Sequence, residues 1–122
     1  MATITPTLTL TSADALSDTL SVAVTDSLTA NGEILVTRVT CSDAGSQLVW
    51  AASGHNKTYI FVKNTSTVET IQLVKTNGGD DYMTLGPEEF AFFPWTGGLD
   101  IYGDMAAGKS AVLEVMAFET AY

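Results

Sequence analysis

Hydrophobic and polar residues alternate one by one along much of this chain. Residues 3–11 read T-I-T-P-T-L-T-L-T, which places the aliphatic side chains on one face of an extended strand and the threonines on the other. Residues 19–25 repeat the device, with Leu and Val opposite Thr, Ser and Ala. Because successive side chains of a strand point to opposite sides, this period predicts β-strands that each bury one face.

Further short runs of the same character follow, separated by turn-forming residues. Asn31-Gly32 predicts a turn, and the short link at 65–67 suggests a hairpin between the runs on either side of it. About eight to ten short strands without a long helix favour an antiparallel β-sandwich or jelly roll. The expected strands after residue 30 are 33–41, 47–52, 57–64, 68–75, 82–85, 88–95, 99–102 and 110–120.

The composition does not divide the chain into separate domains. The pattern indicates a Thr-rich N-terminal β arm over residues 1–30 and a β-sandwich core over 31–122, within a single domain overall. Pro6 has no N–H to give to a sheet, so the first strand is expected at an edge or as an arm. With 122 residues, the chain is long enough to bury a core of its own.

Charge and hydropathy limit the possible partners. Fourteen acidic and five basic residues give a net charge of −9, and the basic residues are scattered, so nucleic acid is not an expected partner. The apolar runs are too short to cross a bilayer and the first residues do not form a secretory signal, so we expect no membrane partner and synthesis in a cytoplasm. Only 16% of residues are charged, which favours a surface that is partly covered in an assembly.

Candidate catalytic and metal-binding groups are few. His55, the single histidine, reads as a surface loop residue with no partner that the sequence identifies, so we expect neither a Ser–His–Asp nor a Cys–His site. One His and one Cys are too few for a zinc site. Residues 103–110 read G-D-M-A-A-G-K-S and match the P-loop pattern, but a P-loop needs a helix where a strand is predicted here. We therefore expect no enzyme and no cofactor. A calcium site would require the convergence of Asp80, Asp81, Asp100 and Asp104.

The large aromatic residues have two possible roles. Exposed rings stack on sugars in many lectin-like proteins, and Trp95 and Tyr102 are the best candidates for exposed aromatics. Large aromatic residues more commonly fill a core. We expect that role for Trp50, Phe61, Phe90, Phe92, Phe93 and Trp95.

The second half of the chain contains a set of stretches that carry a family resemblance. They are Y-I-F-V-K-N-T-S (59–66), E-T-I-Q-L-V (69–74), L-G-P-E-E-F-A-F-F-P-W (85–95), L-D-I-Y (99–102) and L-E-V-M-A-F-E-T (113–120). Through these stretches the chain resembles the small β-sandwich virion structural proteins of tailed bacteriophages, which include capsid decoration (cement) proteins. The resemblance implies a sandwich or jelly roll, often in trimers bound to the shell, and synthesis in the host bacterial cytoplasm. It supplies no catalytic residues.

The resulting hypothesis is a non-enzymatic capsid decoration protein on the surface of a virion. It would stabilise the assembled phage shell by bridging coat subunits, with the major capsid protein as its partner and a homotrimer as its own assembly. The expected coat contact is the arm, through Ile4, Pro6, Leu8 and Leu10. The alternative is a carbohydrate-binding or host-attachment module of a phage tail or fibre, with glycan as its ligand.

Overall fold

The computed structural model of the chain describes residues 2–14, 17, 20–44, 47–51, 57–75, 81–96 and 99–120. Within these residues the chain forms strands and their connections, without a helix. Every pair of neighbouring strands is antiparallel. The predicted all-β, antiparallel class is therefore confirmed.

The described residues contain eleven strands, one more than the upper end of the expected range, because the predicted strand at 3–11 is divided in two. Each of the other predicted strands overlaps an observed one. In chain order the strands are β1 (Ala2–Ile4), β2 (Thr7–Ser12), β3 (Leu20–Thr25), β4 (Leu28–Ser42), β5 (Gln47–Trp50), β6 (Thr58–Asn64), β7 (Ile71–Val74), β8 (Asp81–Leu85), β9 (Phe90–Trp95), β10 (Ile101–Asp104) and β11 (Ser110–Thr120).

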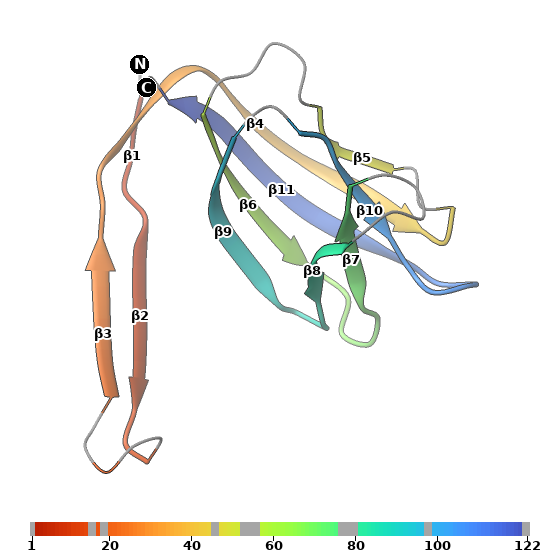
Figure 1. The fold of residues 1–122 in the computed structure, drawn as a ribbon, viewed down its shortest axis with the longest axis horizontal. Helices are drawn as coiled ribbons and strands as arrows, with labels where there is room; N and C mark the ends of the chain where they lie inside the picture. Colours follow the sequence, from red (N-terminus) through yellow and green to blue (C-terminus); the bar gives the residue numbers. More distant parts are fainter. Residues whose placement is uncertain are drawn as a thin grey trace.

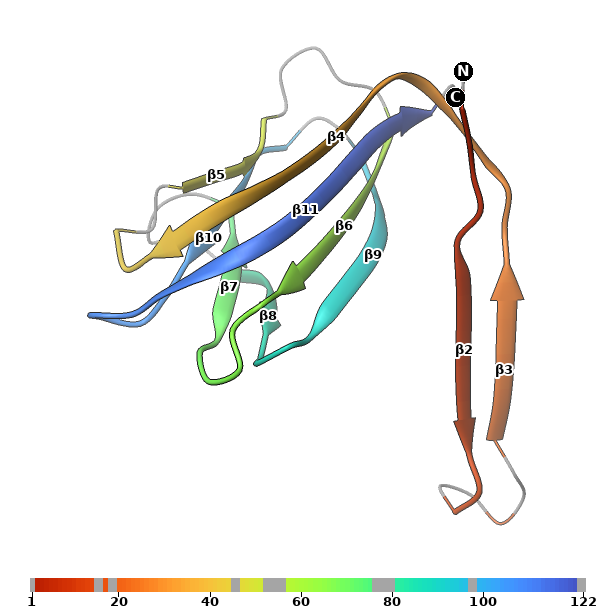
Figure 2. The same ribbon diagram turned by 180° about the vertical axis from the view of Figure 1, so that it is seen from behind.

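The strands form three sheets. The first has the order β1-β4-β11-β6-β9, the second β5-β10-β7-β8, and the third consists of β2 and β3 alone. We call the first two sheets the body, and the segment 5–27, which contains β2 and β3, the arm. Figures 1 and 2 show that the arm extends away from the body, starting near the place where both chain termini lie.

The period of two residues determines how the body is built. Along β6 the residues at 58, 60, 62 and 64 are buried and those between them are partly exposed. β11 lies between β4 and β6 and alternates in the same way, with Leu113, Val115 and Ala117 buried. Because the buried set recurs at every second residue, 110–120 forms a strand and not a helix, as predicted.

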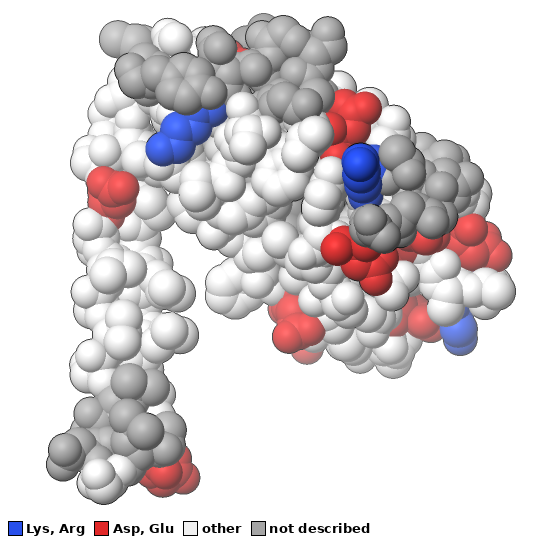
Figure 3. All heavy atoms as spheres, in the orientation of Figure 1, with Lys and Arg blue, Asp and Glu red and all other residues white. Residues whose placement is uncertain are grey.

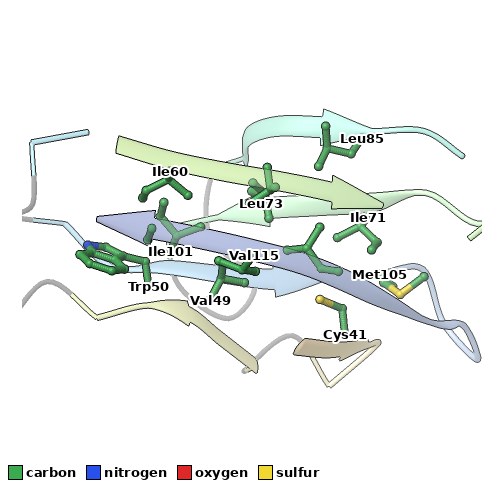
Figure 4. Packing of buried hydrophobic residues seen from close by; sticks show 13 residues of the cluster. Cys41, Val49, Trp50, Ile60, Ile71, Leu73, Leu85, Ile101, Met105 and Val115 are labelled. Atoms are coloured by element: carbon green, nitrogen blue, oxygen red, sulfur yellow. The ribbon is translucent and has the colours of Figure 1, made fainter. Parts of the chain in front are cut away.

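The core lies between the two sheets of the body, as Figure 4 shows at close range. Gly103 of β10 is buried there, and a Cβ at this position would overlap Sγ of Cys41 on β4. The two strands approach each other this closely because position 103 has no side chain. The main members of the core are Ile60, Val62, Leu113 and Val115 from the five-stranded sheet and Val49, Ile71, Leu73, Leu85 and Ile101 from the four-stranded sheet.

A buried asparagine joins the two sheets at one corner. Asn64 ends β6 and has no exposed surface. Its Nδ2 donates to the carbonyl oxygens of Glu69 at 2.7 Å, Gly86 at 3.0 Å and Leu85 at 3.1 Å, and its Oδ1 accepts from the Ser66 amide at 3.0 Å. Buried carbonyl groups are costly without a donor, so this one side chain stabilises both the exit from β6 and the turn between β8 and β9.

The Asn64 corner explains why one local prediction is wrong. Strands β6 and β7 do not pair as a hairpin, because β6 belongs to the five-stranded sheet and β7 to the four-stranded sheet. The chain crosses between the sheets over residues 65–70. The short link resembles a hairpin turn in sequence. The crossing is instead fixed by hydrogen bonds that Asn64 donates to the carbonyl oxygens of Leu85 and Gly86, far along the chain.

A second local prediction is also wrong. Asn31-Gly32 lies inside β4 and not in a turn before a new strand. Gly32 has a φ of 109°, and the pairing of β4 with β11 shifts register between Phe118 and Thr120. The dipeptide therefore forms a bulge within a continuous strand. As a result, β4 crosses the boundary between 1–30 and 31–122 that the sequence pattern suggested.

We expect Asn64→Ala to destabilise the protein by about 3 kcal/mol, because it leaves several buried carbonyl groups without a donor. Asn64→Asp should cost nearly as much, since it keeps the shape of the side chain but loses the NH₂ group. Urea denaturation followed by tryptophan fluorescence measures both. Thr67→Ala, at an exposed position in the same connection, is the matched control and should change little. Equal stability of all three variants would contradict the role of Asn64.

Burial raises the pKa of the Cys41 thiol to about 11 from an ordinary value of 9.0. The thiol is therefore neutral at pH 8, and we expect a thiol reagent to label it only after denaturant is added. Above pH 9 the unfolded chain ionises first, so stability should fall as the pH rises toward 11. The control is Cys41→Ala, whose stability should fall less over that interval. Rapid labelling of the native protein would contradict this prediction.

Candidate functional site

The arm sorts its side chains onto two faces. Leu8 pairs with Val24 and Leu10 with Val22, so these four aliphatic side chains share one face of the hairpin. We call them the arm strip. They are 38–55% exposed, whereas threonine, serine and alanine occupy the opposite face. Side chains of this kind are usually buried, so the arm strip is an apolar surface that its own chain does not cover.

The four residues predicted as a coat contact follow one another along the arm and its base. Ile4 belongs to β1, and Pro6 lies between β1 and β2, where its carbonyl oxygen accepts a hydrogen bond from the Asp26 amide at 3.1 Å. Both are partly buried, whereas Leu8 and Leu10 in β2 are exposed. The missing N–H of Pro6 interrupts the predicted first strand here, and its two parts join different sheets.

A second apolar surface covers the side of the five-stranded sheet that faces away from the core. Cross-strand pairing arranges its residues in rows that run from β4 through β11 and β6 to β9. Val36 is 74% exposed and Phe90 62% exposed, although both are large hydrophobic residues. We call this surface the outer face; one row is Val36, Met116, Phe61 and Phe92, the next is Ile34, Phe118, Tyr59 and Pro94, and Phe90 lies beside them.

The prediction that Phe90 and Phe92 fill the core is wrong. In β9 the residues alternate between the two sides, and Phe93 and Trp95 pack against the core. Phe90 and Phe92 therefore point outward, and Phe61, also expected in the core, lies partly buried among them. The positions of these residues along the strand were the available signal. Successive residues of a strand point to opposite sides, so Phe90 and Phe92 cannot face the same side as Phe93 and Trp95.

The aromatic rings of the outer face contact one another. The ring of Tyr59 stacks on Phe92 and on Phe118, with 5.7 Å between centroids in each case. Phe61 and Phe90 lie 6.4 Å apart in a tilted arrangement. Such pairs stabilise each other beyond the area that they bury, so the outer face is a defined surface even where it is exposed.

The arm and the outer face enclose an open cleft of about 810 Å³. The arm contributes Pro6 and Leu8 to one wall, with Ile4 of β1 at its base, and the outer face contributes Tyr59 and Phe92 to the other. Both walls are apolar. The cleft is therefore suited to another apolar surface more than to a charged or strongly polar ligand.

Positive charge borders the outer face, although the chain as a whole is acidic. Arg38 Nη2 lies 2.9 Å from Glu114 Oε2, and Lys57 Nζ lies 5.2 Å from the ring centroid of Tyr59. Lys63 shares the outward side of β6 with Tyr59. Three of the five basic residues thus belong to this side of one sheet. On the arm, the visible surface in Figure 3 is uncharged between acidic side chains near its two ends.

The two aromatic residues considered for sugar binding are both partly buried. The ring of Trp95 makes edge contacts with Tyr82 at 5.1 Å and Phe93 at 5.7 Å between centroids, and its Nε1 donates to the Leu99 carbonyl oxygen at 2.9 Å. Tyr102 lies in β10 of the other sheet. The structure therefore does not bring Trp95 together with the exposed phenylalanines of the outer face, which lie on the opposite side of β9.

Among the residues that the structure describes, the remaining candidates do not assemble into a site. His55 and Asp80 lie outside the described residues. Within the described ranges, no group of three or more His, Cys, Asp and Glu side chains is placed to hold a metal ion. Residues 103–110 connect β10 to β11, so a strand follows the P-loop-like segment where a P-loop would have a helix.

Comparisons with known proteins do not identify relatives. A scan against protein-family models, a search of curated proteins and a search of solved structures each found no match to this chain. In the part of the chain that the structure describes, there is no helix with the length and hydrophobicity needed to span a membrane.

We expect Phe90→Ala to cost less than about 1 kcal/mol of folding stability, because the side chain is mostly exposed. Ile60→Ala, at a fully buried position on the neighbouring strand, is the comparison and should cost about 2–5 kcal/mol. Urea denaturation of both variants measures the difference. If the two substitutions were equally destabilising, Phe90 would belong to a core and the outer face would not be a free surface.

Proposed function

We propose that the chain is a non-enzymatic structural protein of a virion, and specifically a capsid decoration (cement) protein that bridges adjacent subunits of the decorated shell. The observation that carries this proposal is the arm, a two-stranded hairpin that extends from the body with its aliphatic strip uncovered. An isolated two-stranded hairpin is only marginally stable in water. A neighbouring protein that covers the strip would therefore stabilise the arm as well as the contact.

We also propose that the body is a β-sandwich of the jelly-roll type. Eight of its nine strands pair in a nested order: β4 with β11, β5 with β10, β6 with β9, and β7 with β8. This order supports the proposal, because it results when one long antiparallel hairpin is rolled into two sheets. Jelly rolls occur in viral capsid proteins, and also in lectins and cupins, so the fold favours a virion role without deciding it.

In this proposal the partners are the major capsid protein and further copies of the chain, assembled as a homotrimer on the capsid surface. Selective binding to the assembled shell would stabilise it by mass action. The net charge of −9 supports a free form that stays dispersed before it binds, because like-charged copies repel one another outside the contact surfaces.

Two features support a role without catalysis. Cys41, the single cysteine, is buried, and its raised pKa keeps the thiol neutral and unreactive. The segment 103–110, which has the letters of a P-loop, leads from one strand to another. The surfaces that distinguish this molecule are apolar, and apolar surfaces serve binding.

The carbohydrate-binding alternative has less support. The indole N–H of Trp95 is already donated to Leu99, and its ring edges are covered by Tyr82 and Phe93. The exposed rings are Phe90 and Phe92, which have no polar group with which to bind a sugar hydroxyl.

The test is to purify virions that contain the protein, locate it by electron cryomicroscopy, release it, and add the purified chain back to the stripped shells. We expect the chain on the outer capsid surface, and we expect added protein to rebind and raise the temperature at which the shells open. Leu8→Asp/Leu10→Asp should weaken rebinding by about 100-fold or more, because two apolar side chains that a neighbouring protein would cover in the assembled shell become charged.

The matched control is Thr9→Asp/Thr11→Asp, which places the same charges on the opposite face of the same strand. This variant should rebind nearly as well as the original chain. Location of the protein in a tail fibre, together with binding on a glycan array, would replace this proposal with the attachment alternative.

A further inference from the structure

We propose that the arm strip of one copy docks on the outer face of a second copy of this chain, so that the copies assemble by exchanging arms. The proposal deepens the proposed function, since it rests on the arm as an assembly element and names the partner that its aliphatic side contacts. It concerns the strip and the outer face alone. The strand edges of the arm and the rest of the body stay available to a shell.

Both surfaces are largely uncovered in the single chain, although Phe118 within the outer face is buried. The arm strip is 38–55% exposed, and the outer face contains Val36 and Phe90 at 74% and 62% exposure. A flat hairpin with aliphatic side chains on one side is complementary in shape to a sheet face of aromatic rings. A chain that carries both surfaces has a binding partner in every other copy of itself.

The arm and the border of the outer face carry opposite charges. Residues 2–37 contain no Lys or Arg, and the arm carries Asp14 and Asp26. The outer face is bordered by Lys57 and Lys63 and by Arg38, which is paired with Glu114. Two copies with a net charge of −9 repel each other over most of their surfaces. The acidic residues of the arm against Lys57 and Lys63 are a place where the charges of two copies attract, which favours a second copy as the occupant.

In the proposed assembly the arm strip contacts the outer face of another copy and not that of its own chain. In its own chain the base of the arm is held by pairing of β1 with β4 and by the hydrogen bond from Asp26 to Pro6. From there the arm runs away from the body (Figures 1 and 2), and the cleft of about 810 Å³ stays open between Leu8 and the rings of Tyr59 and Phe92. The arm of another copy can enter this opening.

The contact joins two different surfaces, so it is head-to-tail. Each copy gives one arm and receives one, and a head-to-tail contact closes into a ring when its rotation allows. A closed ring of three copies is the assembly that agrees with the proposed homotrimer. In such a ring every arm strip and every outer face is covered.

The first experiment measures the mass of the purified chain by light scattering at about 10–100 μM. We expect an oligomer for the original protein, a monomer for Leu10→Asp, and an oligomer for the matched control Thr9→Asp, which lies on the other side of the same hairpin. Thermal unfolding of the body should be similar for both variants, which separates lost assembly from lost folding. A monomeric original protein, or an oligomer that survives Leu10→Asp, would overturn the proposal.

The second experiment identifies the surface that the arm contacts. In the double variant Leu10→Cys/Phe92→Cys, mild oxidation should give a ladder of covalent oligomers on a non-reducing gel, whereas Thr9→Cys/Phe92→Cys should give little. Cys41 is buried and does not interfere. A disulfide within one chain, or equal ladders from both variants, would refute docking between copies.

These readouts are independent of shell binding. An arm-exchanged oligomer that does not rebind to stripped shells would contradict the proposed function and leave this inference standing. A monomer that binds shells through its arm would do the reverse.

Discussion

The pairing of β4 with β11 is the contact on which the rest of the molecule depends. It joins Ser110–Phe118 to Ile34–Ser42 in continuous register, so the two ends of the body lie side by side. β11 in turn carries β6, and β6 carries β9, so the position of the outer face follows from this pair. The same long strand β4 continues past the bulge at Gly32 to pair with β1, and it thereby also sets where the arm begins.

Much of the fold was predictable from the sequence because it depends on a local property. Alternation between Leu or Val and Thr places one side of each strand in the core, and every predicted strand after residue 30 overlaps an observed one. What the pattern does not contain is the identity of each strand's neighbour. Asn31-Gly32 has the composition of a turn but forms a bulge, because β11 pairs with both flanking parts of β4. β6 and β7 separate because Asn64 is held by residues about twenty positions away.

The candidate site was predictable in part, for the same reason. The aliphatic side of the arm follows directly from T-L-T-L-T, because strict alternation places both leucines on one face of the strand and the threonines on the other. The outer face was missed because large aromatic residues are usually core residues, and composition alone assigns Phe90 and Phe92 to the interior. Their strand position decides otherwise, since Ala91 and Phe93 occupy the inner side of β9. Strand parity is a stronger guide than side-chain size where a sheet has a single buried face.

The stretches that resemble phage proteins contain residues of both kinds, since some act in folding and others, such as Tyr59 and Phe92, lie on the outer face. The Asn64 side chain at the end of Y-I-F-V-K-N donates to the carbonyl oxygens of Leu85 and Gly86 at the start of L-G-P-E-E, and the Gly86 amide donates in turn to the Glu89 carboxylate. These residues close the corner between the two sheets. The arm strip and the exposed residues of the outer face, by contrast, are not part of the cluster that fills the core. Phe118, which also belongs to the outer face, is fully buried. Folding of the body therefore does not require the arm strip or the exposed outer-face residues, and in the proposed assembly substitutions at Leu8 or Leu10 can change contacts between copies while the body remains folded. A surface that folding does not require, and that nonetheless presents Leu, Val and Phe to solvent, is best explained by a partner that covers it.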